Sequence, residues 1–386
     1  MKRVLVLGID GYIGYTLALH LLKNGYEVAG LDNYSRRRWV KKLGGDSLTP
    51  IATPRARDQY LRSFENFIDQ TSCINLKDYF LISRILDSYR PDTIVHLAEQ
   101  PSAPYSMLSA NACIETQQEN TIGTLALLWA IREKCPDAHL IKIGSMGEYG
   151  TPNCPIPEGI IPEKCLGTPS LSCPMSGLLF PRQPGSFYHL SKVHDTYNID
   201  FACRTWGIRA TDIQQGVVFG CNASSNETEL TRFDYDECFG TVINRFCVQA
   251  LIGTPLTIYG KGTHVRSILP LKDSIQCLNL AIDYPAEPGE YRNLNQYGEY
   301  YDINTMATMV MDAAANYDIE PDYQHLESPR TEALRHIYEP INSNLINLGY
   351  KPTDDMIGAI TELIGNIRPY VTRVIPHTIA PKTQWR

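Results

Sequence analysis

Short apolar runs alternate with helix-length segments over the first half of the chain. Continuous apolar stretches, such as residues 3–7 and 93–97, are typical of parallel strands buried on both faces of a sheet. We expect strands at residues 3–7, 26–31, 72–76, 93–97, 140–143 and 208–213, and helices at 14–24, 78–89, 109–134 and 188–206. Because strands and helices alternate in this order, the pattern predicts an α/β fold with a doubly wound parallel sheet and helices on both faces.

The second half of the chain and two inserted stretches follow other patterns. Beyond about residue 219, shorter mixed elements predict a smaller mixed α/β lobe, residues 219–386, parts of which return to the larger domain of residues 1–218. Residues 151–186 are rich in Pro, Gly and Cys and lack periodicity, which favours a lid over a site or, almost equally, a surface excursion. Residues 33–70 form an insertion that carries Arg36-Arg37-Arg38.

A glycine-rich turn follows the first predicted strand. Gly8, Gly11 and Gly14 at this spacing allow a tight turn, close approach of the backbone to a pyrophosphate, and tight packing of the following helix. The phosphates would lie at the helix N-terminus, where free N–H groups point outward. Asp32 ends the second strand 18 residues after Gly14, where a carboxylate accepts ribose hydroxyls and repels a 2′-phosphate. Together these features predict a Rossmann-type site that prefers NAD to NADP.

The charge run behind Asp32 has two readings. It is either a solvated loop or a segment that brings Arg36 to the cofactor phosphates or the adenine face.

Composition narrows the classes of partner. The formal net charge of −7 argues against nucleic acid or an anionic membrane as the main partner. No apolar run reaches the ~20 residues that a membrane span needs, and a strand begins directly after Met1, so we expect no signal peptide and a cytoplasmic location. The eleven cysteines are scattered without a Cys-x-x-Cys pair, so we expect neither a disulfide framework nor a metal site.

Tyr188 and Lys192 are the main candidates for chemistry. On a helix, residues four apart lie on one face, so their side chains would be neighbours. A nearby ammonium favours the phenolate, so we expect Lys192 to lower the pKa of Tyr188 from its usual value near ~10. Tyr188 could then take a proton from a substrate hydroxyl while hydride leaves the same carbon, with the Ser145 hydroxyl holding the alcohol oxygen. Taken alone, the pair favours a solvated helical face over a catalytic role.

Ser145, Tyr188 and Lys192 behind a glycine-rich cofactor turn resemble the extended short-chain dehydrogenase/reductases. Longer stretches resemble one nucleotide-sugar branch of that family, the UDP-sulfoquinovose synthases, at residues 11–12, 47–52, 99–107, 146–153, 186–195, 239–241 and 244–250. The resemblance covers almost the whole chain. It implies a Rossmann domain, NAD, conversion of UDP-glucose and sulfite to UDP-sulfoquinovose, and a homodimer formed through helices 109–134 and 188–206. An enzyme that donates sulfite could be a further partner.

Three positions depart from the pattern of that branch. Ser145 stands where plant members carry Thr, which keeps the hydroxyl. Pro101 stands where Arg is expected, which removes a contact to sulfite or sugar. Ile74-Asn75 replaces Gly-Asp, so an amide replaces the carboxylate at the adenine. The stretch 151–186 also diverges. These changes affect sulfite handling more than cofactor binding.

The implied reaction needs proton transfer at two places on the sugar. A ketone at C4 makes the C5 hydrogen acidic, loss of that proton with the 6-hydroxyl gives a 5,6-alkene, sulfite adds at C6, and hydride returns to C4. Sugar 4,6-dehydratases carry an Asp-Glu pair after the active-site hydroxyl, where this chain has Met146 and Gly147. We therefore expect Glu148, helped by His189, to act at C5–C6. The alternatives are a surface acid for Glu148 and a packed or solvent-facing side chain for His189.

Two sets of binding residues complete the prediction. The candidate cofactor residues are Gly8, Asp10, Gly11, Tyr12, Ile13, Gly14, Asp32, Asn33, Arg36, Asn75, Leu76, Leu97, Glu99, Tyr188 and Lys192. The candidate substrate residues are Gln100, Tyr105, Asn120, Met146, Gln215, Asn244, Arg245, Arg266 and Arg330. Among the latter, Arg266 and Arg330 carry the most weight, because a guanidinium binds diphosphate in a bidentate manner.

Two other functions are the alternatives to this prediction. A UDP-glucose 4-epimerase or another nucleotide-sugar dehydratase would employ the same three catalytic side chains. A non-catalytic NAD-binding scaffold would not need Ser145, Tyr188 and Lys192 all intact.

Overall fold

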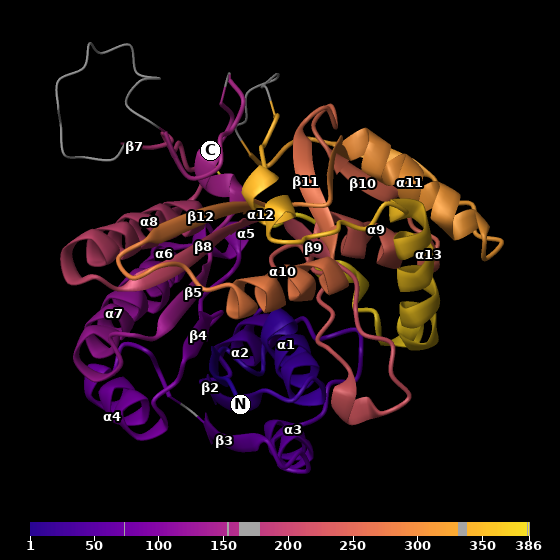
Figure 1. Cartoon of the computed structure of the whole chain (residues 1–386). Coiled ribbons are helices and arrows are strands. Elements are labelled where there is room, and N and C mark those ends of the chain that lie inside the picture. The colour runs from indigo at the N-terminus through magenta and orange to yellow at the C-terminus, as the bar shows by residue number, and fades with distance from the viewer. Residues whose placement is uncertain (73, 153, 162–177, 331–337, 384, 386) are drawn as a thin grey trace, which may run out of the picture.

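The computed structural model describes residues 1–386 apart from 73, 153, 162–177, 331–337, 384 and 386. Its centre is a seven-stranded sheet with the order β12-β8-β5-β4-β1-β2-β3, in which every neighbouring pair is parallel (Figure 1). The strands are β1 (Arg3–Leu7), β2 (Glu27–Asp32), β3 (Phe67–Ser72), β4 (Thr93–His96), β5 (His139–Ile143), β8 (Arg209–Gln215) and β12 (Tyr291–Gln296). The prediction of a doubly wound parallel sheet is confirmed.

Both faces of the sheet are covered by helices, which explains why the strand sequences are apolar throughout. Along β1, Leu5 and Leu7 pack into a core formed with α4, α7 and α8, whereas Val4 and Val6 pack into a core formed with α1 and α10. Successive side chains of a strand point to opposite faces, so both sets must be apolar. The helices are α1 (Tyr12–Lys23), α4 (Tyr79–Tyr89), α7 (Gly123–Lys134), α8 (Phe187–Trp206) and α10 (Leu271–Asp283).

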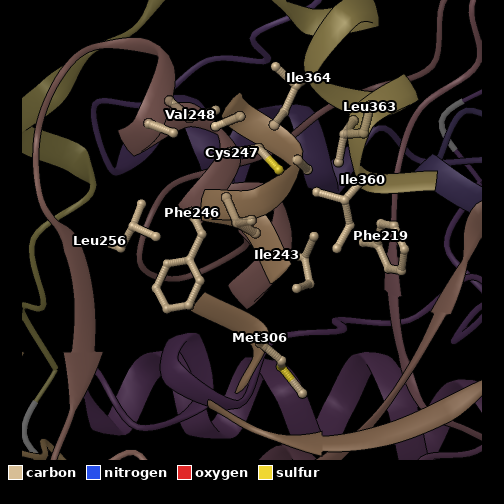
Figure 2. Close-up of a cluster of buried hydrophobic side chains, with 14 of the residues drawn as sticks. Phe219, Ile243, Phe246, Cys247, Val248, Leu256, Met306, Ile360, Leu363 and Ile364 are labelled. Atoms are coloured by element: carbon tan, nitrogen blue, oxygen red, sulfur yellow. The ribbon is translucent and has the colours of Figure 1, made fainter. Parts of the chain in front are cut away.

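A second lobe lies beside this domain and has its own core. Figure 2 shows side chains of α9, α11 and α13 meeting there, including Phe246, Met306 and Ile360, which are fully buried. Its helices and strands are β9 (Val217–Phe219), α9 (Val242–Leu251), β10 (Leu256–Tyr259), β11 (Val265–Pro270), β13 (Glu299–Asp302), α11 (Ile303–Ala315), β14 (Tyr323–Leu326) and α13 (Met356–Ile367). Two elements from the second half of the chain belong to the larger domain: strand β12 is part of the central sheet, and helix α10 packs against it.

The remaining elements are short. They are α2 (Ser35–Lys42), α3 (Pro54–Leu61), α5 (Ala103–Ser106), α6 (Ala110–Gln117), β6 (Ile160–Ile161), β7 (Leu178–Leu179) and α12 (Ser343–Asn347). Within the described residues, no helix has the length and apolar character that crossing a membrane requires.

Three expectations about these elements need correction or comment. The strand predicted at 72–76 is wrong: β3 begins at Phe67, and it was missed because an edge strand is only partly apolar, with Ile68 exposed. The helix predicted at 109–134 is divided into α6 and α7 by a π-helical turn at Gln118–Ile122. The lid predicted at 151–186 lies partly outside the described residues.

Candidate active site

A cavity of about 740 Å³ lies between the sheet domain and the second lobe. One wall is built by the loops that follow β1, β2, β4 and β5 and by the start of α8, which is the edge where parallel sheets place their ligands. The other wall is built by residues around β9, α9, β10 and β11 and by the segment 328–330. The cavity therefore extends from the strand ends of the sheet to the second lobe.

The glycine-rich turn packs too tightly for any side chain. A Cβ on Gly14 would lie 2.1 Å from the carbonyl oxygen of Gly8, and a Cβ on Gly8 would lie 2.8 Å from the backbone of Leu97. Gly8 also has a φ of +85°, which favours glycine. Helix α1 begins after Gly11, which has no side chain to occupy its first N–H groups. These features fit a pyrophosphate at the helix N-terminus.

Asp32 lies on the cavity wall at the end of β2. Its carboxylate accepts hydrogen bonds from the backbone N–H groups of Asp10 (2.8 Å) and Tyr34 (2.6 Å). Burial, with help from the Asp10 charge, raises the pKa of Asp32 to about 6, and the two backbone bonds oppose that rise. The carboxylate is thus fixed where ribose hydroxyls would reach it.

Asp10 and Asn75 were expected at the cofactor but are not among the residues that line the cavity. The Asp10 carboxylate pairs with Arg37 (2.5 Å) and Arg57 (2.9 Å), so it anchors the insertion to the sheet domain. The Asn75 amide donates to Glu119 at 3.1 Å. Both side chains are held away from the cavity by charged partners. These partners are distant in sequence, so the glycine-rich motif does not reveal them.

The other expected cofactor residues lie on the wall. They are Gly8, Gly11, Tyr12, Ile13, Gly14, Asn33, Arg36, Leu76, Leu97, Glu99, Tyr188 and Lys192. Arg36 does face the cavity, with its guanidinium paired to Asp234 (2.7 Å) and stacked 4.0 Å from the ring centroid of Phe239. The Arg36 side chain is therefore fixed by these contacts and is not part of a solvated loop.

Helix α8 presents Tyr188 and Lys192 to the cavity, one turn apart. The helix begins after Ser186, whose hydroxyl accepts from the N–H of His189 (3.1 Å). The Lys192 ammonium lies 5.7 Å from the centroid of the Tyr188 ring and donates to Ile143 O (2.6 Å) and to Glu99. Ser145, directly after β5, lines the cavity beside them. The structure therefore brings the three predicted catalytic side chains together.

The expected lowering of the Tyr188 pKa is not what the protein alone produces. Burial raises the pKa of Tyr188 above its usual value, and the Glu99 carboxylate raises it further, while Lys142 and the Ser145 hydroxyl act against them. Burial outweighs the nearby cations because a phenolate loses its hydration inside the protein.

Glu148 is fully buried and is not among the cavity-lining residues, contrary to the expected role at C5–C6. One carboxylate oxygen accepts from the Ser145 N–H (3.0 Å), and the other accepts from Arg182 Nε (2.9 Å) and Thr196 Oγ1 (3.1 Å). Glu148 and Ser145 form a capping box, which turns the carboxylate back under the loop. Burial raises the pKa of Glu148 to about 7, with Arg182 opposing that rise.

His189 lies on the cavity wall, whereas Glu148 from the Ser145 loop does not. Its Nδ1 lies 3.0 Å from Ser186 Oγ. A Cβ on Gly147 would lie 2.2 Å from His189 Nε2, so glycine at 147 is what lets the imidazole lie against the loop.

Five of the nine expected substrate residues line the cavity, namely Met146, Gln215, Arg245, Arg266 and Arg330. The other four hold the interior together instead. Gln100 donates to Thr116 Oγ1 (2.8 Å), Tyr105 donates to Glu115 (2.7 Å), Asn120 links Gln100 to Ser191 Oγ (2.9 Å), and Asn244 accepts from Gly220 N (3.0 Å). Their polar groups have partners within the protein, and none of the four is among the cavity-lining residues.

Two wall or near-wall residues were missed by the sequence reasoning. Trp385 lines the cavity, with the Arg330 guanidinium 4.6 Å from its ring, and no motif points to it. Lys142 is buried beneath Lys192, and its charge between the apolar residues Ile141 and Ile143 of β5 is a sequence feature that could have indicated it.

Comparison with known proteins adds to this geometry. Residues 4–296 match the NAD dependent epimerase/dehydratase family, which confirms the predicted cofactor. The whole chain is 42 % identical to the chloroplastic UDP-sulfoquinovose synthase of Spinacia oleracea, covering 79 % of that protein. It is 40 % identical to the UDP-sulfoquinovose synthase of Sulfolobus acidocaldarius, covering 98 % of that protein.

Solved structures support the same fold. The UDP-glucose 4-epimerase of Thermotoga maritima, solved with UDP-glucose, aligns over 95 % of this chain and 99 % of its own, with a TM-score of 0.69 and 21 % identity. The UDP-glucuronic acid 4-epimerase of Bacillus cereus, solved with UDP-glucuronic acid and NAD, aligns over 96 % and 99 %, with a TM-score of 0.68 and 21 % identity. The full-length similarity is much higher to the synthases, and the chain belongs to the UDP-sulfoquinovose synthases within the NAD dependent epimerase/dehydratase family.

Proposed function

We propose that this chain converts UDP-glucose and sulfite to UDP-sulfoquinovose, with NAD recycled within each turnover. The observation that carries the proposal is the convergence of Ser145, Tyr188 and Lys192 on one cavity, in a chain similar over its full length to two synthases. Arg245, Arg266 and Arg330 line the opposite end, where bidentate guanidinium groups suit a diphosphate.

The chain's own residues fit the cofactor. The glycine turn would hold the pyrophosphate at the start of α1, and Asp32 would accept the adenosine ribose hydroxyls and repel a 2′-phosphate. When bound, NAD supplies the acceptor and later the donor of one hydride at C4 of the sugar.

Tyr188 and Ser145 manage the proton at O4. Tyr188 accepts the hydroxyl proton as C4 becomes a ketone, and gives it back when C4 is reduced again. Lys192 favours the phenolate, and the Ser145 hydroxyl, held by the capped loop, orients O4.

The proton at C5 is assigned to His189. It is a titratable side chain beside Tyr188 on the cavity wall, whereas Glu148 faces the interior and supports the Ser145 backbone. His189 removes the C5 proton, and the imidazolium so formed gives that proton to the 6-hydroxyl, which leaves as water and gives a 5,6-alkene conjugated to the C4 ketone. Sulfite then forms the C–S bond at C6, and C5 regains a proton. Pro101 lines the cavity without a hydrogen-bond donor, so it cannot replace arginine as a contact to sulfite.

A homodimer is proposed from the surface of α6, α7 and α8, which lie together on one side of the molecule (Figure 1). Ile114, Trp129, Tyr197 and Phe201 are exposed on these helices. Exposed apolar side chains gathered on one face often mark an interface. Analytical ultracentrifugation of the unmodified protein tests this directly, and a monomer at all concentrations would contradict it.

Incubating the protein with NAD, UDP-glucose and sulfite, and identifying the product by mass, tests the function. A sulfonated UDP-sugar that forms only with sulfite is expected. UDP-galactose formed without sulfite would indicate the epimerase, a 4-keto-6-deoxy sugar would indicate a dehydratase, and unchanged UDP-glucose would indicate a scaffold.

A further inference from the structure

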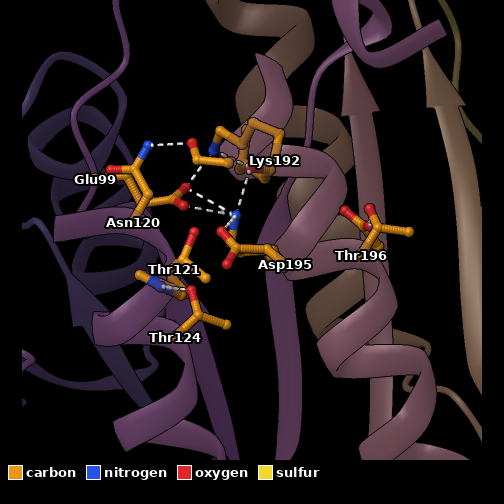
Figure 3. A network of polar contacts seen from close by, with 12 residues as sticks. Glu99, Asn120, Thr121, Thr124, Lys192, Asp195 and Thr196 are labelled. Atoms are coloured by element: carbon orange, nitrogen blue, oxygen red, sulfur yellow. Dashed lines mark hydrogen bonds and ion pairs between the residues drawn. The ribbon is translucent and has the colours of Figure 1, made fainter. Parts of the chain in front are cut away.

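A second lysine is buried directly behind the active-site lysine. Lys142 belongs to β5, its side chain is 1 % exposed, and its ammonium lies 2.8 Å from Glu99 Oε1 and 3.1 Å from Asp195 Oδ2. Glu99 Oε2 accepts hydrogen bonds from both Lys142 Nζ (2.9 Å) and Lys192 Nζ. Figure 3 shows Glu99, Lys192 and Asp195 facing one another in this network. A buried ammonium is strongly unfavourable unless it is paired, so an apolar strand would not carry one without compensation.

The position of Glu99 creates a problem that Lys142 can solve. Glu99 lies on the cavity wall near Tyr188, and its charge opposes ionisation of the phenol. If Glu99 were paired with Lys192 alone, the two charges would largely cancel, and Lys192 would present little net positive field to Tyr188. Lys142 contacts the same carboxylate, so the three groups together carry one positive charge when both lysines are protonated; burial lowers the pKa of Lys192, and the Glu99 carboxylate opposes that fall.

Other charged and titratable groups surround this network from four elements. They are His96 on β4, Glu148 in the turn after β5, His189 and Asp195 on α8, and Asp212 on β8. Burial raises the pKa of Asp195 well above its usual value, which favours its uncharged form. An uncharged Asp195 would leave the positive charge of the lysine pair in place.

We propose that Lys142 is a positioning residue: by holding the Glu99 carboxylate between two ammonium groups, it allows Lys192 to promote the ionisation of Tyr188. This inference rests on the proposed function for its kinetic consequence. It assigns Lys142 no contact with substrate.

The first test is the pH dependence of the oxidation step. NAD-loaded enzyme is mixed with UDP-glucose in the absence of sulfite, and NADH absorbance is followed in a single turnover between about pH 6 and pH 10. The rate should rise with pH as Tyr188 ionises. In Lys142→Met the acid limb should move to higher pH by about 1 unit, so that the rate below the limb falls about 10-fold. A limb that stays in place would overturn the proposal.

A second pair of variants removes the risk that Lys142→Met does not fold. Glu99→Gln and the double variant Glu99→Gln/Lys142→Met both lack the carboxylate that would lose one of its two ammonium partners in Lys142→Met. The acid limb should lie at lower pH in Glu99→Gln than in the unmodified enzyme, and it should return upward in the double variant. A purely structural Lys142 would change the melting temperature of these proteins without moving the limb.

A direct readout of position 188 needs no turnover. With 3-fluorotyrosine at 188, the fluorine resonance of the NAD-loaded protein reports ionisation of the phenol, and the same order of variants is expected. If the unmodified enzyme formed no NADH from UDP-glucose, the proposed function would fail, while the fluorine titration would still decide the role of Lys142.

Discussion

The assignment of the C5 proton to His189 leads to a test in which two variants should behave in opposite ways. Glu148→Gln keeps an acceptor for the Ser145 N–H but leaves the Arg182 guanidinium, whose side chain is 2 % exposed, without its carboxylate. Breaking a buried pair in this way costs about 3–5 kcal/mol, and we expect the free energy of unfolding to fall by about 3 kcal/mol because the amide keeps part of the contact. His189→Asn removes the imidazole at the cavity wall and should change stability much less.

Exchange at C5 separates the two roles. Each enzyme is incubated with NAD and UDP-glucose in deuterium oxide at about pH 8, above the range where a histidine ordinarily titrates, and C5 deuterium is measured by mass and NMR. His189→Asn should lose about 10²–10⁴ in the exchange rate, the usual contribution of a general base. Glu148→Gln should stay within about 10-fold while its urea midpoint falls. If exchange were undiminished in His189→Asn and lost in Glu148→Gln, Glu148 would be the base at C5. That result would refute the inference that the buried Glu148 carboxylate only supports the Ser145 loop.

Three other predictions follow from the same structure. Asp32→Ala should weaken the preference for NAD over NADP, measured as the ratio of the two dissociation constants; equal binding of both by the unmodified protein would contradict the ribose assignment. Tyr188→Phe should keep the melting temperature but slow NADH formation about 10²–10⁴-fold, and a near-normal rate would exclude Tyr188 as the base. Burial raises the pKa of Glu158 to about 7, above its unfolded value, so the folded state binds more protons and stability should fall as pH rises from about 4.5 to about 7. The free energy of unfolding should therefore be higher at pH 5 than at pH 8. This decrease should be larger in the unmodified protein than in Glu158→Gln by up to about 3 kcal/mol, and an equal decrease in both proteins would refute the prediction.

Residues that act within one turn or one strand could be predicted from the sequence. The glycine-rich turn, Asp32 at the end of β2, and the pair Tyr188 and Lys192 all depend on spacing along the chain, and each lies where the spacing placed it. Edge strand β3 was misplaced because half of its surroundings are solvent, so its sequence lacks the apolar continuity of central strands.

Polar side chains near the site could not be sorted by the same reasoning. Asp10, Asn120 and Asn244 were themselves expected to contact ligand, yet each has polar partners inside the protein. A buried polar group must find a partner, and whether that partner is a ligand or a neighbouring residue depends on segments that fold against it.

The sequence by itself determined the parallel sheet, the cofactor turn and the catalytic helix face, because strand and helix periodicity and the i, i+4 neighbour relation are properties of the local chain. The tertiary structure alone decided that Glu148 turns inward and that Lys142 meets Glu99. The direction of the Glu148 carboxylate is set by Arg182 and Thr196, which lie far along the chain. Lys142 reaches Lys192 only because β5 and α8 pack together around a carboxylate from the end of β4. A buried charge needs a partner, so such long-range pairs are energetically necessary. No local sequence pattern shows which charged residues will be buried together.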